Sequence, residues 1–405
     1  MSKAIILGDP HIGKNLSQGK VGIGSTINSR IDDQIKLLDY VLDKAIEHHA
    51  DDIIVTGDIW EDPRPHSELI TMFLAWLKKC QAYGVHVHII RGNHDILRSG
   101  FVYSSPLDII SEVELENVSI YKDVDTIIIG MSAFTFVPFR DRKSFSVNSN
   151  AEALNLLNDS LTYELAAIPV TYRRILVGHL AIQGSIPVGD EIDDLTNELF
   201  CPVDMFKDYD YVWMGHVHKP QVMNKIKPFV AHIGSMDISN FGETDHHKHI
   251  VIVDCNARGK QPVFEQEWLP TRPLKKISIT IPKDTADPTK YALDIIKGYK
   301  KSKDSLDKAI IKIDITLEVP DLKSVNKSVI EKYLMEHGAF NVTGISESKK
   351  VALVKKDVNN TIDTKMDVAS AIKTYSDAYV AKDKREAFIE LSMEIFNLYK
   401  EEAKE

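Results

Sequence analysis

Residues 85–95 read Val-His-Val-His-Ile-Ile-Arg-Gly-Asn-His-Asp, and this stretch determines the predicted fold. Val85–Ile90 is a short run rich in Ile and Val, which is typical of a β-strand. Directly after it comes the polar turn Gly92-Asn93-His94-Asp95. A strand that ends in such a turn indicates an α/β sheet that gathers polar groups at the carboxyl ends of its strands.

The same arrangement recurs throughout residues 1–255. Apolar residues at helical spacing predict helices over Ile31–His49 and Ser67–Tyr83. Strands that alternate with crossover helices predict an α/β fold with a layered sheet core. The further strand candidates are Ala4–Leu7, Ile53–Thr56, Ile127–Met131, Arg174–Val177, Tyr211–Met214, Phe229–Ile233 and His249–Asp254.

A second pattern begins near Leu269–Pro273 and predicts a small α+β domain. Its expected strands and helices are Lys275–Ile281, Pro288–Tyr299, Ile310–Leu317, Val325–His337 and a closing hairpin of Asn341–Ser346 and Lys350–Val354. From about Thr361 the chain is helical and polar, and Asp383–Lys400 carries an apolar stripe of Phe388, Leu391, Ile395 and Leu398. Such a helix docks on its own chain or offers the stripe to a partner. We expect domains at 1–270, 271–356 and 357–405.

Composition limits the classes of function. The 405 residues include no run of about 18 apolar residues and no apparent leader, so we expect no membrane association and a cytoplasmic protein. Three distant cysteines predict reduced thiols rather than disulfides or a zinc site.

The charge distribution differs between the two parts of the chain. The net charge of −10 argues at first against a nucleic-acid partner. Residues 1–270 carry 24 Lys and Arg against 37 Asp and Glu, whereas residues 271–405 carry 25 against 22. An acidic first part suits a domain whose carboxylates bind metal ions, because those ions return positive charge to the site.

Five polar motifs follow predicted strands in the first part. Because the carboxyl ends of such strands converge, we expect their side chains to meet in one place. Glycine precedes four of the motifs and allows the tight turn that each requires. The motifs are Asp9-Pro-His11, Gly57-Asp58, Gly92-Asn93-His94-Asp95, Gly178-His179 and Gly215-His216-Val-His218.

This set of side chains predicts a two-metal centre. Oxygen ligands mixed with imidazole, without sulfur, favour manganese, iron or zinc over calcium. In the expected arrangement Asp58 bridges the two ions and His94 binds neither of them, but neutralises phosphate or protonates the leaving oxygen. Asp95 is expected to orient the His94 ring. One ion would be held by Asp9, His11, Asp58 and His218, and the other by Asp58, Asn93, His179 and His216.

Each of these motifs alone carries little information, since a single His near a strand end is usually structural. Together and in this order they resemble the calcineurin-like metallophosphoesterase superfamily. Within it the chain is similar to SbcD-type nucleases, through Gly57-Asp58-Ile-Trp60-Glu-Asp62-Pro-Arg64-Pro and through Gly234-Ser235 followed by Phe241-Gly242-Glu243.

The resemblance implies a fold and an activity. The fold is a layered β-sandwich core with flanking helices, a small α+β capping domain and a helical tail. The activity is cleavage of DNA with two Mn²⁺ ions (or Mg²⁺ or another divalent metal), as an exonuclease on duplex ends and an endonuclease on single strands or hairpins. The resemblance also implies a homodimer, an SbcC-like ATPase bound through the C-terminal tail, and a role in DNA repair and recombination in a prokaryotic or viral setting.

Several basic residues lie in loops near the motifs and are candidates for contacts with the DNA backbone, although solvated surface charge is the alternative. They are Lys14, Lys20, Arg30, Arg64, Arg98, Arg140 and Arg142. For Trp60 and Phe101 we favour core packing over stacking on a base. Gly13–Gly24 lacks the Gly-Lys-Ser/Thr of a P-loop, so we expect this chain to bind no nucleotide.

Two other functions remain open at this point. The first is a small-substrate phosphoesterase, against which stand the absence of the Asp-Arg-Gly continuation of protein phosphatases and of a Tyr ligand. The second is a scaffold without catalysis, which the complete set of metal-ligand candidates argues against.

Overall fold

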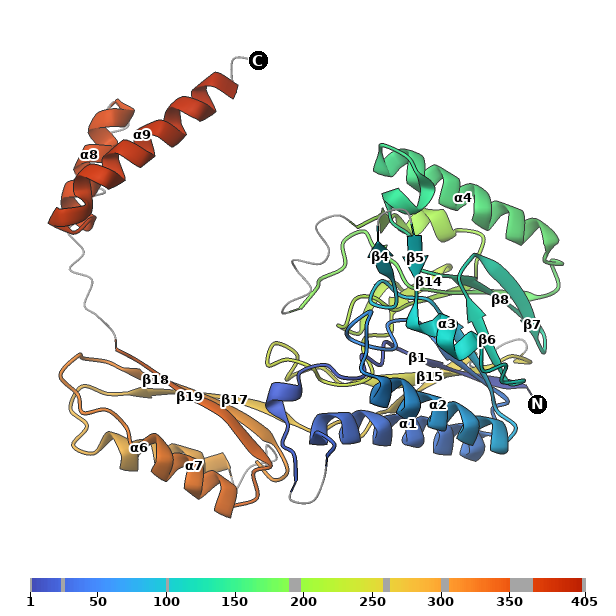
Figure 1. Cartoon of the computed structure of the whole chain (residues 1–405), viewed down its shortest axis with the longest axis horizontal. Coiled ribbons are helices and arrows are strands. Elements are labelled where there is room, and N and C mark those ends of the chain that lie inside the picture. The colour runs from blue at the N-terminus through green and yellow to red at the C-terminus, as the bar shows by residue number, and fades with distance from the viewer. Residues whose placement is uncertain are drawn as a thin grey trace. The chain divides into compact units, whose positions relative to one another are not determined.

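The computed structural model describes residues 2–22, 26–99, 102–188, 198–257, 263–299, 306–349 and 367–402 (Figure 1). Two compact units are present. The larger comprises Met1–Ile281, Thr285–Thr316 and Lys323–Ser348, and the smaller comprises Pro282–Asp284, Leu317–Leu322 and Lys349–Glu405.

The first sheet of the larger unit has six strands in the order β16-β15-β1-β2-β3-β6. Strands β1, β2, β3 and β6 run parallel, and β15 and β16 continue the sheet antiparallel. Their bounds are Lys3–Leu7 for β1, Asp52–Val55 for β2, His86–Ile90 for β3, Val118–Tyr121 for β6, His249–Asp254 for β15 and Phe264–Trp268 for β16.

The second sheet also has six strands, in the order β13-β14-β12-β9-β8-β7. Strands β8, β9, β12 and β14 run parallel, and β7 and β13 are antiparallel edges. Their bounds are Asp125–Ile129 for β7, Ser132–Val137 for β8, Arg173–Gly178 for β9, Tyr211–Met214 for β12, Gln221–Asn224 for β13 and Phe229–His232 for β14.

The two sheets pack face to face with helices outside them. Because side chains alternate along a strand, Ala4 and Ile6 of β1 point into the core between the sheets, while Ile5 and Leu7 face the helices. Helices α1 (Ser29–His48) and α2 (Ser67–Ala82) cover the first sheet side by side, and α4 (Asn150–Ala167) covers the second (Figure 1). The expected layered sandwich with flanking helices is confirmed.

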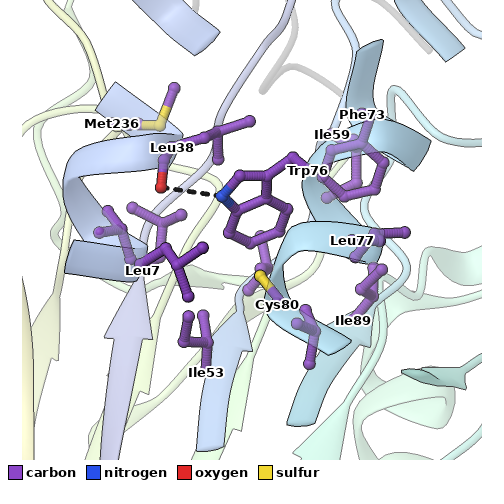
Figure 2. Close-up of a cluster of buried hydrophobic side chains, with 14 of the residues drawn as sticks. Leu7, Leu38, Ile53, Ile59, Phe73, Trp76, Leu77, Cys80, Ile89 and Met236 are labelled. Carbon is purple, nitrogen blue, oxygen red and sulfur yellow. Dashed lines mark hydrogen bonds between the residues drawn. The ribbon is translucent and has the colours of Figure 1, made fainter. Parts of the chain in front are cut away.

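The core under α1 and α2 is centred on Trp76 (Figure 2). Its indole Nε1 donates to the carbonyl of Leu38 at 2.9 Å, which satisfies the polar atom of an otherwise apolar ring. Ile53 and Ile89 of the sheet are buried in the same cluster, and each such side chain contributes about 1.5–3 kcal/mol when fully buried. This packing holds rigid the strands whose ends carry the polar motifs.

The predicted elements agree with the structure at most positions, but one predicted strand crosses a turn and several strands were not predicted. The strand expected over Ile127–Met131 crosses a turn at Gly130, which separates β7 from β8. Strands β6, β8, β13 and β16 were not expected. Trp60 is buried, as predicted, and Phe101 lies outside the described residues. The short elements are α3 (Pro106–Ser111), β4 (Leu97–Ser99), β5 (Val102–Ser104), β10 (Ala181–Ile182), β11 (Phe200–Cys201) and 3-10 turns at Leu16–Gln18, Arg142–Phe145, Val203–Phe206 and Lys382–Lys384.

The chain then forms the expected small α+β region. Strands β17 (Leu274–Ile281), β18 (Ile310–Leu317) and β19 (Asn341–Lys349) make one sheet, with α6 (Pro288–Tyr299) and α7 (Lys327–Glu336) between them in sequence. Ile277, Ile279 and Ile281 are buried at every second position of β17, which gives this sheet one apolar face. Strand β19 extends beyond Ser346, and the second half of the predicted hairpin, 350–354, lies outside the described residues.

The smaller unit contains two helices, α8 (Val368–Tyr379) and α9 (Arg385–Glu402). They contact each other through the stacked rings of Tyr375 and Phe388, whose centroids are 6.0 Å apart, and through an ion pair of Arg385 with Asp377 at 3.0 Å. Leu391 and Ile395 of α9 are each 59% exposed. Within the described ranges, no helix combines the length and the apolar character needed to cross a bilayer.

Candidate metal centre

The loops that follow β1, β2, β3, β9 and β12 converge at one end of the sandwich. Backbone hydrogen bonds join them there, with His11 N donating to Asp58 O at 2.9 Å and Gly215 N donating to Gly178 O at 2.9 Å. Five of the expected ligands, Asp9, His11, Asp58, His179 and His218, are at most 4% exposed. Buried carboxylates and imidazoles are costly unless they form hydrogen bonds or ion pairs, and these side chains form such interactions with one another.

One group of potential ligands consists of Asp9, His11 and His218, whose ligand atoms all lie within 4.8 Å of one another. The Nε2 atoms of His11 and His218 are only 2.9 Å apart. Two imidazole nitrogens that face each other at this distance suit a shared cation, because both can then direct lone pairs at it.

The second group consists of Asp58, His179 and His216, also within 4.8 Å. His179 Nε2 lies 3.2 Å from Asp58 Oδ2, and the Asn93 amide oxygen lies 2.8 Å from His179 Nε2 and 3.0 Å from His216 Nδ1. The other nitrogen of His179, Nδ1, is 2.9 Å from the carbonyl of Thr56. Since a carbonyl only accepts, Nδ1 carries the proton and Nε2 is left to bind a metal.

Asp58 lies between the two groups. Its Oδ2 is 3.5 Å from His11 Nε2 and 3.2 Å from His179 Nε2. A carboxylate in this position can serve two ions at once. The donor set of oxygen and imidazole therefore suits a pair of divalent cations. The buried His216 Nε2 makes no hydrogen bond within the described residues, although Glu198 Oε2 lies 3.7 Å from it.

Three of these residues have left-handed backbone conformations, with φ of 43° at His11, 48° at Asp58 and 76° at His216. For a residue with a side chain this conformation costs on the order of 1–3 kcal/mol, and it persists only where surrounding structure enforces it. Strain at three converging turns is consistent with a functional site.

The glycines of two motifs are required by close packing. A Cβ on Gly92 would lie 2.1 Å from Asp58 Oδ1, and one on Gly215 would lie 2.3 Å from Asp9 Oδ1. Any side chain at these positions would push the carboxylates out of place, so glycine here allows close approach as well as a turn.

The protonation of Asp9, His11 and His216 suits cation binding. Burial opposes the charge on Asp9, but the neighbouring His179 outweighs it and lowers the pKa of Asp9 to about 2. Burial lowers the pKa of His11 to about 4 and that of His216 to about 3. At neutral pH Asp9 is therefore ionised and both imidazoles are neutral, the forms in which they bind metals. Burial opposes a charge on His179, but the carboxylates of Asp58 and Asp9 outweigh it and raise the pKa of this ring well above its ordinary value, so a metal bound at its Nε2 would displace a proton.

His94 lies beside both groups, and its ring centroid is 4.9 Å from that of His11. With His11 and Asp58 it forms a third group of potential ligands, whose ligand atoms also lie within 4.8 Å of one another. Its backbone N donates to Asp58 Oδ1 at 2.8 Å, and its Nδ1 lies 2.7 Å from the carbonyl of Glu61. Burial opposes a charge on this ring, but the Asp58 carboxylate outweighs that effect and raises the pKa of His94. The Nε2 atom is thus the one available to a substrate.

The expected role of Asp95 is not what the structure shows. Its carboxylate accepts hydrogen bonds from Gly92 N at 2.9 Å and Ile59 N at 3.0 Å, so it ties the second and third loops together. The His94 ring is oriented by the carbonyl of Glu61 instead. Burial raises the pKa of Asp95 to about 7, because the charge sits in a dry position close to Asp58.

Glu61 is a site residue that the sequence analysis missed. Its Oε2 lies 2.9 Å from His11 Nδ1 and 2.9 Å from Lys14 Nζ. A carboxylate behind a ligand histidine fixes the orientation of the ring and the nitrogen that faces the metal. The sequence could have indicated this role, because Glu61 lies only three residues after the expected ligand Asp58. Glu198 Oε2, 3.7 Å from His216 Nε2, had no comparable signal.

A buried ion pair supports the last histidine motif from behind. Lys248 and Glu243 have no exposed side-chain surface, and Lys248 Nζ is 2.6 Å from Glu243 Oε2. The same Nζ donates to the carbonyl of His218 at 2.8 Å and to Ser235 Oγ at 2.8 Å. This pair therefore determines the position of the His218 backbone.

The candidate DNA contacts fall into different environments. Arg30 is fully buried, with its guanidinium 2.6 Å from Asp237 and 3.2 Å from Asp33, so its expected DNA contact is wrong. Arg140 is used by Asp123 and the carbonyl of Lys122. Lys14 is paired with Glu61, and Lys20 Nζ donates to the carbonyl of Phe340 at 2.8 Å. Arg64 and Arg142 are exposed, and the side chain of Arg98 lies outside the described residues.

Comparisons with known proteins agree with this site. A sequence profile described as calcineurin-like phosphoesterase matches residues 2–220. The chain is 24% identical over 286 residues to the SbcD chain of the nuclease SbcCD from Staphylococcus epidermidis, covering 68% of this chain and 71% of that protein. It is 23% identical over 287 residues to the SbcD chain of the same nuclease from Escherichia coli K12, covering 66% and 68%.

Among solved structures, a dimetal phosphatase of Danio rerio has 11% sequence identity and a TM-score of 0.38, over 62% of this chain and 91% of that one.

Proposed function

Since the chain belongs to the calcineurin-like phosphoesterase family, and is therefore a metal-dependent hydrolase of phosphate esters, we propose that its substrate is DNA. We propose exonuclease action on duplex ends and endonuclease action on single strands or hairpins. The observation that carries this proposal is similarity to two bacterial proteins named as components of a nuclease, over about two thirds of the chain.

The proposed ligands divide between two ions as the two groups of side chains do. Asp9, His11 and His218 would hold one ion, Asn93, His179 and His216 the other, and Asp58 would bridge them. When bound, two divalent cations supply positive charge to the phosphoryl oxygens and lower the pKa of water toward neutrality. We propose manganese, with Mg²⁺ or another divalent ion as the alternative, because the donors mix hard oxygen with imidazole.

The chain's own contribution to the reaction centres on His94. Its Nδ1 is held at 2.7 Å by the carbonyl of Glu61, which leaves Nε2 directed away from that loop. We propose that Nε2–H donates a hydrogen bond to the phosphate and gives its proton to the leaving oxygen. Asp95 would act indirectly, by fixing the loop on which His94 stands.

DNA binding would depend on cations near this centre. Lys14 lies against Glu61, and Arg64 follows it by three residues, so both are suited to phosphates that extend from the reacting one. Lys20, Arg98 and Arg142 remain proposed contacts, whereas Arg30 and Arg140 are occupied by carboxylates and carbonyls. The acidic surface of the first part makes such local positive charge necessary.

We propose that an SbcC-like ATPase binds the helical tail, and that this chain binds no nucleotide itself. Leu391 and Ile395 are each 59% exposed on α9, although they lie on its apolar stripe. Exposed apolar side chains at helical spacing are suited to a groove on a partner. We propose three domains: residues 1–270 catalyse the reaction, residues 271–356 cap the DNA and residues 357–405 bind the partner. We also propose that the chain forms a homodimer.

The test is a digest of end-labelled duplex and hairpin DNA by the purified chain with manganese, magnesium or EDTA. We expect shortening of the duplex and opening of the hairpin with manganese only or preferentially. Hydrolysis of small phosphodiesters with no cleavage of either DNA would contradict the proposal and indicate a small-substrate phosphoesterase. Absence of any hydrolysis with intact metal binding would indicate a scaffold.

A further inference from the structure

A second concave site lies beside the metal centre, at the same end of the sandwich. It is a cavity of about 390 Å³, within the roughly 300–1,000 Å³ usual for ligand pockets. Its walls come from the carboxyl ends of β12 and β14, from β13, and from the paired positions His249 and Trp268 of β15 and β16. Two indoles, those of Trp213 and Trp268, line it.

Trp268 is exceptional among the tryptophans. The chain has four, all within the described residues, and Trp60, Trp76 and Trp213 are at most 1% exposed. Trp268 is 57% exposed. An indole is a large apolar surface. When one is exposed at the edge of a cavity, it indicates a site of contact with a ligand or partner.

The exposed indole packs against two histidine rings. The rings of His247 and His249 lie against it at centroid distances of 5.6 Å each, both steeply inclined to its plane. His249 is held in turn by Gln266, whose amide nitrogen is 3.0 Å from His249 Nε2. These contacts restrict the rotamers of the indole, which lowers the conformational entropy lost when a flat ligand stacks on it.

The cavity and the metal centre share short segments of backbone. Lys219 lines the cavity and directly follows His218. His232 lines it too, and its Nδ1 is 3.0 Å from the carbonyl of Gly215, the residue before His216. Lys248, between the two ring-contacting histidines, donates to the carbonyl of His218 at 2.8 Å. The segment Gly215–Lys219 therefore takes part in both the metal centre and the wall of this cavity.

Resting on the nuclease function proposed above, we propose that this cavity holds a nucleobase of a single DNA strand, stacked on the indole of Trp268. Every base has a flat π-face, so stacking tolerates any sequence, as a nuclease of general specificity requires. Lys219 and Asp245 both line the cavity, and of these charged residues Lys219 supplies positive charge for the adjoining backbone, whereas Asp245 opposes it. Bases inside a duplex are already paired and stacked, so the cavity selects single strands and frayed ends.

Binding is tested by tryptophan fluorescence, because Trp268 is the indole that solvent reaches. The probe is a single-stranded thymidine 12-mer, added to the manganese-loaded His94→Ala chain, with a gel to verify that the strand stays intact. We expect quenching by the 12-mer and none by the same strand made entirely of abasic sites, which keeps the phosphates. Equal quenching by both strands would overturn the proposal, because phosphates alone would then account for the change.

Substitution gives the second test, by fluorescence anisotropy of labelled 12-mer in the same background. Trp268→Ala should weaken binding about 5- to 100-fold, and Trp268→Phe should retain most of it. Tyr163→Ala is the matched control, since Tyr163 is a 78% exposed aromatic on α4 and should leave binding unchanged. Unaltered affinity in Trp268→Ala would refute the stacking site.

Cleavage separates this inference from the function on which it rests. With an otherwise unaltered chain and manganese, Trp268→Ala should raise KM for single-stranded DNA and leave hydrolysis of bis-p-nitrophenyl phosphate unchanged, since that ester has no base. If the unsubstituted chain cleaves no DNA, the proposed nuclease function fails. If it cleaves DNA and Trp268→Ala does so with the same KM, only the stacking site fails.

Discussion

Nε2 of His11 and Nε2 of His218 lie 2.9 Å apart, although 207 residues separate them in the chain. Burial lowers the pKa of His11 to about 4, so this ring is neutral at physiological pH. A proton between the two nitrogens is bonded to one of them and accepts the lone pair of the other only as a hydrogen bond. A divalent cation accepts the lone pairs of both nitrogens as ligands. The relationship therefore links the stability of the fold to metal binding.

Metal loading is expected to stabilise the protein. Manganese that binds the native state alone adds about 2.7 kcal/mol when its concentration is 100 times Kd, and the melting temperature rises accordingly. His218→Ala should remove most of this rise, whereas His86→Ala, at a half-buried histidine bonded to Ser119, should keep it. Calorimetry with manganese and EDTA measures the difference. An equal metal-dependent rise in His218→Ala would contradict the proposed ligand set.

His94→Ala is expected to abolish cleavage and to leave both metals bound. Loss of a general acid lowers kcat by about 10²- to 10⁴-fold. Because His94 contributes its backbone N to Asp58 and not a required ligand atom in the proposed set, the manganese-dependent rise in melting temperature should persist. Rates on labelled DNA and calorimetry on the same preparation test this. Full activity in the variant would exclude the assigned role.

Gly92→Ala is expected to damage the site more than the fold. Its Cβ would lie 2.1 Å from Asp58 Oδ1, so the carboxylate or the loop must move, and metal binding should weaken at least about tenfold. Gly344→Ala is the control, because a Cβ there meets nothing within 4 Å. Titration with manganese, followed by isothermal calorimetry, compares the two. Equal affinities would mean that the Asp58 position tolerates the displacement.

The buried pair of Lys248 and Glu243 should make stability depend on pH. Burial opposes the charge on Glu243, but Lys248 outweighs it and lowers the pKa of Glu243 below its ordinary 4.5. The stabilisation is therefore complete above the ordinary value and is lost as pH falls through the lowered one. Lys248→Met should cost about 3–5 kcal/mol at pH 7, because it leaves a buried charge alone.

The control for that pair is the double variant Lys248→Met with Glu243→Gln, which removes both charges and should regain much of the loss. Urea unfolding of the three proteins between pH 3 and pH 7 provides the measurement. A single Lys248→Met variant as stable as the unsubstituted chain would show that Glu243 reaches solvent.

Removing residues 362–405 is expected to preserve manganese-dependent cleavage and to uncouple it from ATP. The ligand candidates all lie in the larger unit, whereas α8 and α9 belong to the smaller one. Cleavage assays and size-exclusion chromatography with an SbcC-like ATPase test the two halves of this expectation. Normal complex formation by the truncated chain would place the partner's binding site elsewhere.

The sequence predicted the elements whose pattern is local. Helices α1 and α2 have uninterrupted apolar spacing, and β1, β2 and β3 end at recognisable turns, so each was found within a residue or two at most ends. Strand β8 was missed because Ser132–Val137 is buried on both faces and shows no alternation. The edge strands β13 and β16 were missed because polar residues interrupt their apolar ones.

The sequence predicted which residues form the site, but it predicted less well which side chains and backbone groups those residues contact. A ligand is marked by its residue type and by the glycine before it, as at Asp58 and His179. What a side chain meets across the fold has no local mark, so Arg30 was expected on DNA although Asp33 and Asp237 hold it inside. For the same reason Asp95 was paired with its neighbour His94 rather than with the amides of Gly92 and Ile59.

The left-handed turns at His11, Asp58 and His216 bear on how this chain responds to engineering. Glycine at any of the three would relieve a conformational penalty on the order of 1–3 kcal/mol, and would delete a proposed ligand in doing so. A screen for heat resistance that is run without metal would therefore enrich stable proteins that have lost activity, because the stabilisation that bound metal adds does not count in it. Thermal robustness and hydrolysis compete at these three backbone positions, so any selection for the first has to be coupled to an assay of the second.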